Sequence, residues 1–219
     1  MGWTTRFPIL FRHMRMRWNR GNAAIEFAFV APAFFALMLG VLEIGTMTFS
    51  QFALQNSVTT AARLIRTGQA QAFVDGSAAL KNAPKCQGGN DKNGYTTTAS
   101  WFRGQICCNL FGLISDTQCN QTDTLYINVS SAADFAAAGN FSTAVQNVTN
   151  NYNPGASCDV VLIRATYAWK VWFPGLATLL NTNNANYLVN MQATNPGTHL
   201  LSATAAIRNE PYEDTVSGC

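Results

Sequence analysis

The residues whose spacing suggests chemistry stand directly before the longest apolar run of this chain. Gly21 precedes Glu26 by five positions, and Phe27 opens the run. A carboxylate at the edge of hydrocarbon costs on the order of a few kcal/mol unless it finds a partner, so Glu26 is a candidate functional residue. Hydrolysis after Gly21 would create an amine on Asn22, about one helical turn from Glu26. This spacing predicts charge pairing between that amine and Glu26, within one chain or between neighbours.

The element that would position these residues is a transmembrane helix. Residues 27–42 contain no charged or strongly polar side chain, and Glu26 and Glu43 bracket them. With its flanking residues the run reaches roughly the 20 residues that a bilayer requires. Pro32 and Gly40 lie inside the run. Because Pro32 removes one backbone donor, it is expected to bend the first half of the helix.

The distribution of charge predicts how this span is oriented. Residues 1–21 contain five arginines and no acidic residue, whereas the rest of the chain has nine Lys or Arg against eleven Asp or Glu. The positive-inside rule therefore places this basic leader in the cytoplasm and the residues beyond about 46 outside. Basic charge confined to a leader also argues against nucleic-acid binding, which needs such charge on the folded part.

Two other interpretations of the apolar run are a buried core helix and a conventional signal peptide. A core helix does not normally follow a basic leader that lacks acidic residues. A signal peptide needs a cleavage site soon after its apolar run, and Ala31-Pro32-Ala33 lies too early, inside the run. Charged residues make up only 11% of the chain, against roughly 25% in soluble domains, which favours a membrane or secreted protein.

Several segments of the first 68 residues, and one near the C-terminus, carry recognisable motifs. They are RGNAAIEF at 20–27, AP at 31–32, GVLEIG at 40–45, QNSV at 55–58, AAR at 61–63 and AIRNEPY at 206–212. Together they resemble the TadE-like minor pseudopilins of the tight-adherence (Flp/Tad) pilus system. The resemblance extends over residues 18–68 and is thin between 70 and 200.

The resemblance implies a function in pilus assembly for surface adherence. A membrane prepilin peptidase would cleave at Gly21, Glu26 would be required for processing or assembly, and Phe27 is the aromatic that follows it. The implied location is the bacterial inner membrane, crossed once, with a periplasmic C-terminal head. The implied partners are the peptidase, other pilus-assembly components and pilins, and the lipid bilayer.

A major pilin of this type is little more than the processed helix, so the additional residues favour a minor component. Whether the protein enters the filament is left open. The alternative is an unprocessed bitopic membrane protein with a periplasmic binding head, in which Glu26 and Glu43 are merely carboxylates flanking a span.

The helix is expected to continue from the membrane into the head. No proline or glycine lies between Gly45 and Thr67, and Gly68 is a plausible C-terminal cap. Apolar residues repeat there with helical spacing, which predicts a face that packs against a core. They are Leu54, Val58, Ala61, Ala62 and Ile65.

The remaining chain predicts an α+β head in which a small antiparallel sheet packs on the long helix, a pilin-like layout. Expected strands are 124–129, 159–171 and 199–208, the second with a bulge or covered on both faces. Expected short helices are 100–114 and 132–148, and the Asn-rich stretches 140–153 and 181–190 are expected loops. The predicted division is a leader at 1–21, the membrane and extended helix at 22–68, and the head at 69–219.

Six cysteines lie on the predicted outer side of the membrane: Cys86, Cys107, Cys108, Cys119, Cys158 and Cys219. An even number in an oxidising compartment predicts disulfides, with 15 possible pairings. Since adjacent cysteines rarely bond each other, Cys107 and Cys108 are expected to have different partners.

No metal, cofactor or enzymatic activity is expected. The head has no CxxC pair, and its one histidine is His199, which lies in an expected strand without a nucleophile motif nearby. Asp123, Asp134 and Asp159 are available carboxylates, but nothing in their spacing singles them out.

Overall fold

The structure is a computed structural model of the chain. It describes the backbone of residues 15–73, 75–83, 95–110, 119, 124–140, 150–173, 198–212 and 219, with side chains from Ala23 onward. Contacts divide the chain into Met1–Ile44, here called the N-terminal unit, and Gly45–Cys219, here called the folded unit. The two units share one long helix, α1 (Arg15–Arg66), and each is described by itself.

Helix α1 begins at Arg15, earlier than the predicted start at residue 22. Residues 15–25 contain one poor helix former, Gly21, and a helix tolerates a single glycine at a cost of about 1 kcal/mol. The helix ends at Arg66, and Gly68 adopts a left-handed φ of 76°. The Gly68 N–H donates to the carbonyl of Ile65 at 3.0 Å, so the predicted glycine cap is present.

Replacement of Gly68 with alanine is expected to destabilise the folded unit more than the same change at Gly76. Both glycines have positive φ, so a Cβ costs about 1–2 kcal/mol at each site. At Gly68 the added Cβ would also lie 2.6 Å from Cγ of Tyr212, whereas at Gly76 it would meet nothing. This crowding should add about 1–3 kcal/mol to the loss at Gly68. Urea unfolding of both variants measures the difference, and equal losses would contradict the Tyr212 contact.

The sheet of the folded unit has four strands in the order β2-β1-β3-β4. Strands β1 and β4 flank β3 in antiparallel pairs, as predicted, but β2 pairs with β1 in parallel, so the sheet is mixed. The bounds are β1 (Leu125–Ala132), β2 (Asn151–Tyr152), β3 (Val160–Lys170) and β4 (Thr198–Arg208). The three long strands confirm the predicted ones, with β1 three residues longer than expected at its C-terminal end.

Strand β3 is covered on both faces and carries no bulge. Its pairing with β4 runs without interruption from Val160 to Lys170. Four consecutive residues, 165–168, are buried, which requires cover on both sides because neighbouring side chains point to opposite faces. This explains why its apolar residues do not keep a period of two.

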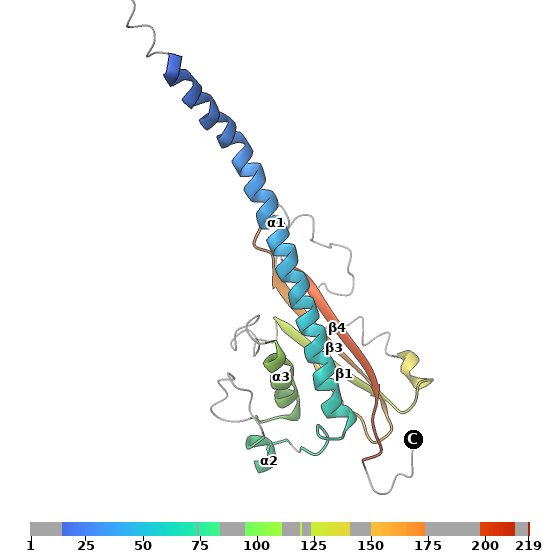
Figure 1. The fold of residues 1–219 in the computed structure, drawn as a ribbon. Coiled ribbons are helices and arrows are strands. Elements are labelled where there is room, and N and C mark those ends of the chain that lie inside the picture. Colours follow the sequence, from blue (N-terminus) through green and yellow to red (C-terminus); the bar gives the residue numbers. More distant parts are fainter. Residues whose placement is uncertain are drawn as a thin grey trace, which may run out of the picture. The chain divides into compact units, whose positions relative to one another are not determined.

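The second half of α1 packs against this sheet, as predicted from its apolar stripe. All five stripe residues are at most 2% exposed and share a core with β1, β3 and β4. Figure 1 shows this part of the helix running beside β4. Two glutamine side chains join the elements directly: Gln51 donates to the Ser202 carbonyl at 2.7 Å, and Gln55 to the Thr204 carbonyl at 3.0 Å.

Three further helical segments complete the described part of the fold. They are α2 (Ala78–Lys81), α3 (Thr98–Asn109) and the 3-10 turn η1 (Ala137–Asn140). The prediction of a helix at 100–114 is close to α3, which a Thr97 capping box starts two residues earlier. The prediction of a helix from 132 is wrong at its start, because β1 continues to Ala132 and only one short turn follows. Residues 141–149 and 181–190 lie outside the described residues.

Candidate processing site and membrane segment

All four predicted processing residues lie on α1. The backbone is helical at Gly21 and Asn22, and the side chains of Glu26 and Phe27 are exposed. A rise of about 1.5 Å per residue separates the nitrogen of Asn22 from the Cα of Glu26 by about 6 Å along the helix axis. An amine created at Asn22 would therefore lie within reach of the Glu26 carboxylate.

The charges around the start of α1 oppose the helix dipole. The first turn contains no acidic residue and begins at an arginine, although the N-terminus of a helix favours negative charge. Removal of residues 1–21 would take away every leader arginine and leave Glu26 as the fifth residue of the chain. Cleavage would thus place an acidic side chain near the new helix start, where the dipole stabilises it.

The apolar part of α1 has the surface of a membrane span. An 18-residue window in Ala23–Arg66 reaches a mean hydropathy of 2.2, and none of it is buried. Its exposed side chains include Phe27 at 69%, Phe29 at 80% and Leu37 at 69%. A core helix would bury such residues, so that interpretation is contradicted, and one long apolar helix fits a single-pass membrane protein.

The three other predicted residues of the span, Pro32, Gly40 and Glu43, differ in their surroundings. Pro32 lies inside α1 without ending it, and a Cβ added at Gly40 would meet nothing within 4 Å. Glu43 is only 8% exposed, and it is the one buried carboxylate among the described residues. Glu26 is exposed, so the two carboxylates that bracket the span are not equivalent.

Disulfides join distant parts of the folded unit. Cys107 on α3 pairs with Cys119 across a Cα–Cα distance of 6.0 Å, and Cys158 pairs with Cys219 across 5.3 Å. Cys108 is disulfide-bonded as well, so it and its neighbour Cys107 have different partners. Cys86 lies outside the described residues.

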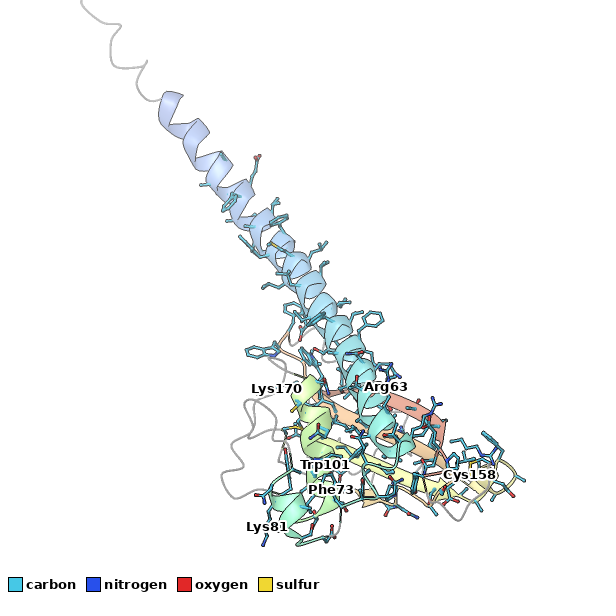
Figure 2. All side chains as sticks on the ribbon, turned by 60° about the horizontal axis from the view of Figure 1, so that its bottom comes forward. Arg63, Phe73, Lys81, Trp101, Cys158 and Lys170 are labelled. Carbon is cyan, nitrogen blue, oxygen red and sulfur yellow. A yellow bond between two sulfur atoms is a disulfide. The ribbon has the colours of Figure 1, made fainter. Side chains whose placement is uncertain are left out.

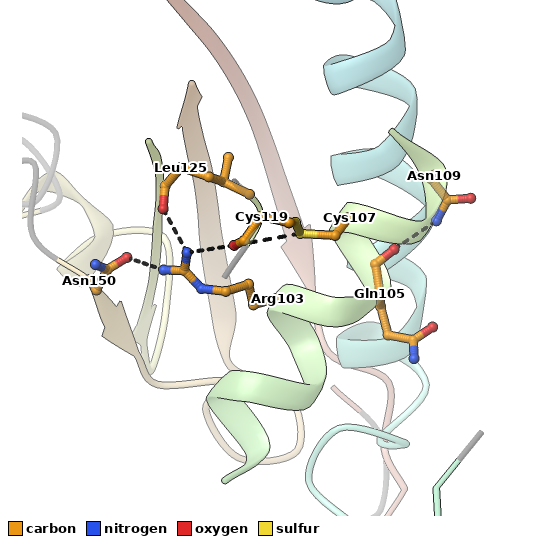
Figure 3. Close-up of a disulfide and its surroundings, with 7 residues drawn as sticks. All are labelled: Arg103, Gln105, Cys107, Asn109, Cys119, Leu125 and Asn150. Atoms are coloured by element: carbon orange, nitrogen blue, oxygen red, sulfur yellow. Dashed lines mark hydrogen bonds between the residues drawn. A yellow bond between two sulfur atoms is a disulfide. The ribbon is translucent and has the colours of Figure 1, made fainter. Parts of the chain in front are cut away.

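Arg103 ties α3 to the sheet beside the first disulfide, as Figure 3 shows. Its guanidinium donates to the carbonyls of Cys119 at 3.2 Å and Leu125 at 2.8 Å, and to Oδ1 of Asn150 at 2.8 Å. The same Asn150 oxygen accepts the N–H of Ile127 at 3.1 Å. Burial lowers the pKa of Arg103 from its ordinary value. Sequence reasoning missed this arginine, because nothing in its neighbours distinguishes it from a surface cation.

The carboxylates considered for catalysis cap local turns. Oδ1 of Asp134 accepts the N–H of Ala137 at 2.7 Å, and Oδ2 of Asp159 accepts the N–H of Ala156 at 2.8 Å. Asp123 lies outside the described residues. Within the described ranges, no three His, Cys, Asp or Glu side chains are grouped so that they could hold a metal ion.

The AIRNEPY segment closes the folded unit against the end of α1. Asn209 is 2% exposed, and its amide donates to the carbonyls of Pro154 at 3.0 Å and Ala156 at 2.8 Å. The N–H of Glu210 donates to the Arg66 carbonyl at 2.9 Å, and the side chains of these two residues form an ion pair at 3.0 Å. This motif therefore fastens the last strand to the helix.

Comparison with known proteins gives one match. Residues 21–63 match the family model described as TadE-like protein. No curated protein and no solved structure matches the chain. The family resemblance inferred from the motifs is confirmed over this segment, which begins at Gly21 and ends inside the stripe of α1 that packs on the sheet.

Proposed function

Because residues 21–63 carry a TadE-like segment, we propose that this chain is a minor pseudopilin that helps to assemble a Tad/Flp-type pilus. The family indicates a pilus-associated protein, and the finer role is our proposal. The observation that carries it is the position of the match: it begins at the glycine after which the motif predicts cleavage.

In this proposal maturation is one hydrolytic step. A membrane prepilin peptidase hydrolyses the peptide bond between the carbonyl of Gly21 and the nitrogen of Asn22, and the 21-residue basic leader is released. The formal charge of the chain then changes from +3 to −2, because five arginines leave with it. The protein stays in the bacterial inner membrane through α1, with its folded unit in the periplasm.

The exposed span suits both a lipid and a protein environment. Lipid tails and the apolar helices of other pilins offer surfaces of similar polarity, so transfer between them costs little hydrophobic free energy. A charge pair between the Asn22 amine of one chain and Glu26 of another would fix their register in a medium where an unpaired charge is costly. A major pilin of this type is little more than the processed helix. The presence of a folded unit in this chain therefore supports a role as a minor component.

Replacement of Glu26 with alanine is expected to abolish or strongly reduce piliation, because the new amine loses its anionic partner. Glu26→Asp keeps the charge and is the matched control, expected to retain most of the pili. Counting pili by electron microscopy, with immunoblots to confirm equal amounts of protein, measures the effect. Normal piliation in the alanine variant would remove Glu26 from the proposed mechanism.

A further inference from the structure

The folded unit exposes aromatic side chains close to the point where the apolar span ends. Phe49 is 65% exposed and Phe52 69% exposed, and they follow the last residue of the N-terminal unit by five and eight positions. Trp172, just beyond the end of β3, is 82% exposed. Exposed aromatic rings in this number normally have an apolar or amphipathic neighbour.

Hydrogen bonds within the folded unit place Trp172 at the same end of this unit as the phenylalanines. Gln51 and Gln55 donate hydrogen bonds to the carbonyls of Ser202 and Thr204, so α1 and β4 run in the same direction. The four helical residues and the two strand residues between these contacts both span about 6 Å. Thr198 lies four residues before Ser202, about 13 Å back along the strand, which corresponds to about nine helical residues. The start of β4 therefore lies toward the first residues that α1 contributes to the folded unit.

The pairing of β3 with β4 brings Trp172 to this same end of the sheet. Lys170 pairs with Thr198, so the last residue of β3 lies at the same end of the sheet, two residues before Trp172. Figure 1 shows the end of β3 and the start of β4 beside the first turns that α1 contributes to the folded unit. Figure 2 shows Lys170 and Cys158 at opposite ends of the sheet.

We propose that this end of the folded unit binds the headgroup layer of the bilayer in which α1 is anchored. The binding surface comprises Phe49, Phe52, Trp172 and Lys170, here called the aromatic end. Phe49 and Phe52 lie within about 8 Å of Met47, where the apolar span runs out, and the headgroup layer is about 5–8 Å thick on each side. Tryptophan is enriched at this depth because its ring is apolar and its N–H is polar.

The charge beside the rings favours lipid over a second apolar protein surface. Lys170 is exposed, and a lysine can bury its methylene chain against lipid while its ammonium binds phosphate oxygens. The surface also continues the apolar span along the chain, since Gly45 follows Ile44 directly. This inference rests on the membrane anchoring assumed in the proposed function. It adds that the folded unit itself lies on the membrane and is not held away from it.

Depth-dependent fluorescence quenching tests the aromatic end. The mature chain is placed in vesicles of phosphatidylethanolamine and phosphatidylglycerol that contain lipids brominated near the headgroup. The Trp172 signal is the difference between the parent chain and Trp172→Phe, which keeps a ring and leaves the buried Trp101 and the half-buried Trp169 as a constant background. The control is a Trp172→Phe, Phe135→Trp chain. Phe135 is 69% exposed but follows the end of β1 that pairs with Val160, at the opposite end of the sheet.

The proposal expects brominated lipid to quench Trp172 strongly and to leave a tryptophan at position 135 unaffected, while soluble acrylamide shows the reverse. If acrylamide alone quenches Trp172 in protein that stays with the vesicles, the aromatic end does not bind the headgroup layer. The membrane anchoring of α1 would still stand in that case. Shielding of Trp172 from both quenchers would also overturn this headgroup binding, in favour of contact with another protein chain. Protein that separates from the vesicles in alkaline carbonate would instead contradict the membrane anchoring itself.

Discussion

A chain in which Gly21 is replaced with leucine is expected to keep its leader. A bulky side chain at the bond to be cut should prevent the peptidase from seating its substrate, and processing should fall to a trace. The product would retain all five leader arginines and a formal charge of +3, where the cleaved chain has −2. Isoelectric focusing and intact mass separate the two forms in membranes from cells that contain the peptidase.

The matched control for this variant is Gly40→Leu. Both changes add the same side chain to α1, and a Cβ at Gly40 meets nothing within 4 Å, so no clash in the chain itself is expected. Cleavage of the Gly40 variant should therefore be normal. Pili should be absent from cells that carry only the Gly21 variant. Normal maturation of that variant would show that Gly21 does not define the processing site.

Removal of the Cys158–Cys219 disulfide is expected to destabilise the folded unit more than removal of Cys107–Cys119. The first bridge joins residues 61 apart and the second joins residues 12 apart. In the chain-entropy account these loops correspond to about 4 and about 3 kcal/mol, respectively. The longer bridge also lies beside the Asn209 contacts that fasten β4, so its loss should loosen this end of the sheet.

Paired cysteine-to-serine variants of the mature chain, unfolded in urea in detergent micelles, measure this order of stability.

The disulfides also indicate where the folded unit is located, because they form in the periplasm and not in a reducing cytoplasm. Alkylation of protein from freshly lysed cells should therefore find these four cysteines blocked unless a reductant is added first. Free thiols at these positions in native protein would contradict a periplasmic folded unit.

Sequence patterns predicted the helices and strands whose own consecutive residues carry a clear periodicity or β-branched composition. The stripe from Leu54 to Ile65 repeats with helical spacing, and the structure buries it completely. The β-branched and aromatic runs of β1, β3 and β4 were equally clear. In each case the local preference of the backbone agrees with the burial that the sheet and helix require, so the two signals reinforce each other.

Features that depend on partners distant in the chain were not predictable in the same way. Strand β2 has only two residues, in a stretch rich in asparagine, and it is defined by its parallel pairing with Asn128 and Val129 of β1. The early start of α1 at Arg15 was missed because Gly21 was treated as outside the helix. Arg103 and Asn209 gain their importance only from carbonyls that folding brings to them.

The candidate site also combines features that the sequence predicts with features that depend on the folded structure. The spacing of Gly21, Glu26 and the apolar run was visible at once, and the family match begins at Gly21. The burial of Glu43 was not visible, because a glutamate at the edge of an apolar run has the same sequence pattern whether its side chain is exposed or buried. The aromatic end could not be predicted from the sequence, because only the register of the β-sheet brings Trp172 to the same end of the folded unit as helical residues more than 100 positions earlier.

The most direct test of the central claim is the N-terminal sequence and intact mass of the protein from native membranes, with and without the prepilin peptidase. The account predicts a chain that begins at Asn22 when the peptidase is present and at Met1 when it is deleted. A chain that begins at Met1 in both strains would contradict it, and would favour an unprocessed bitopic protein with a periplasmic binding head.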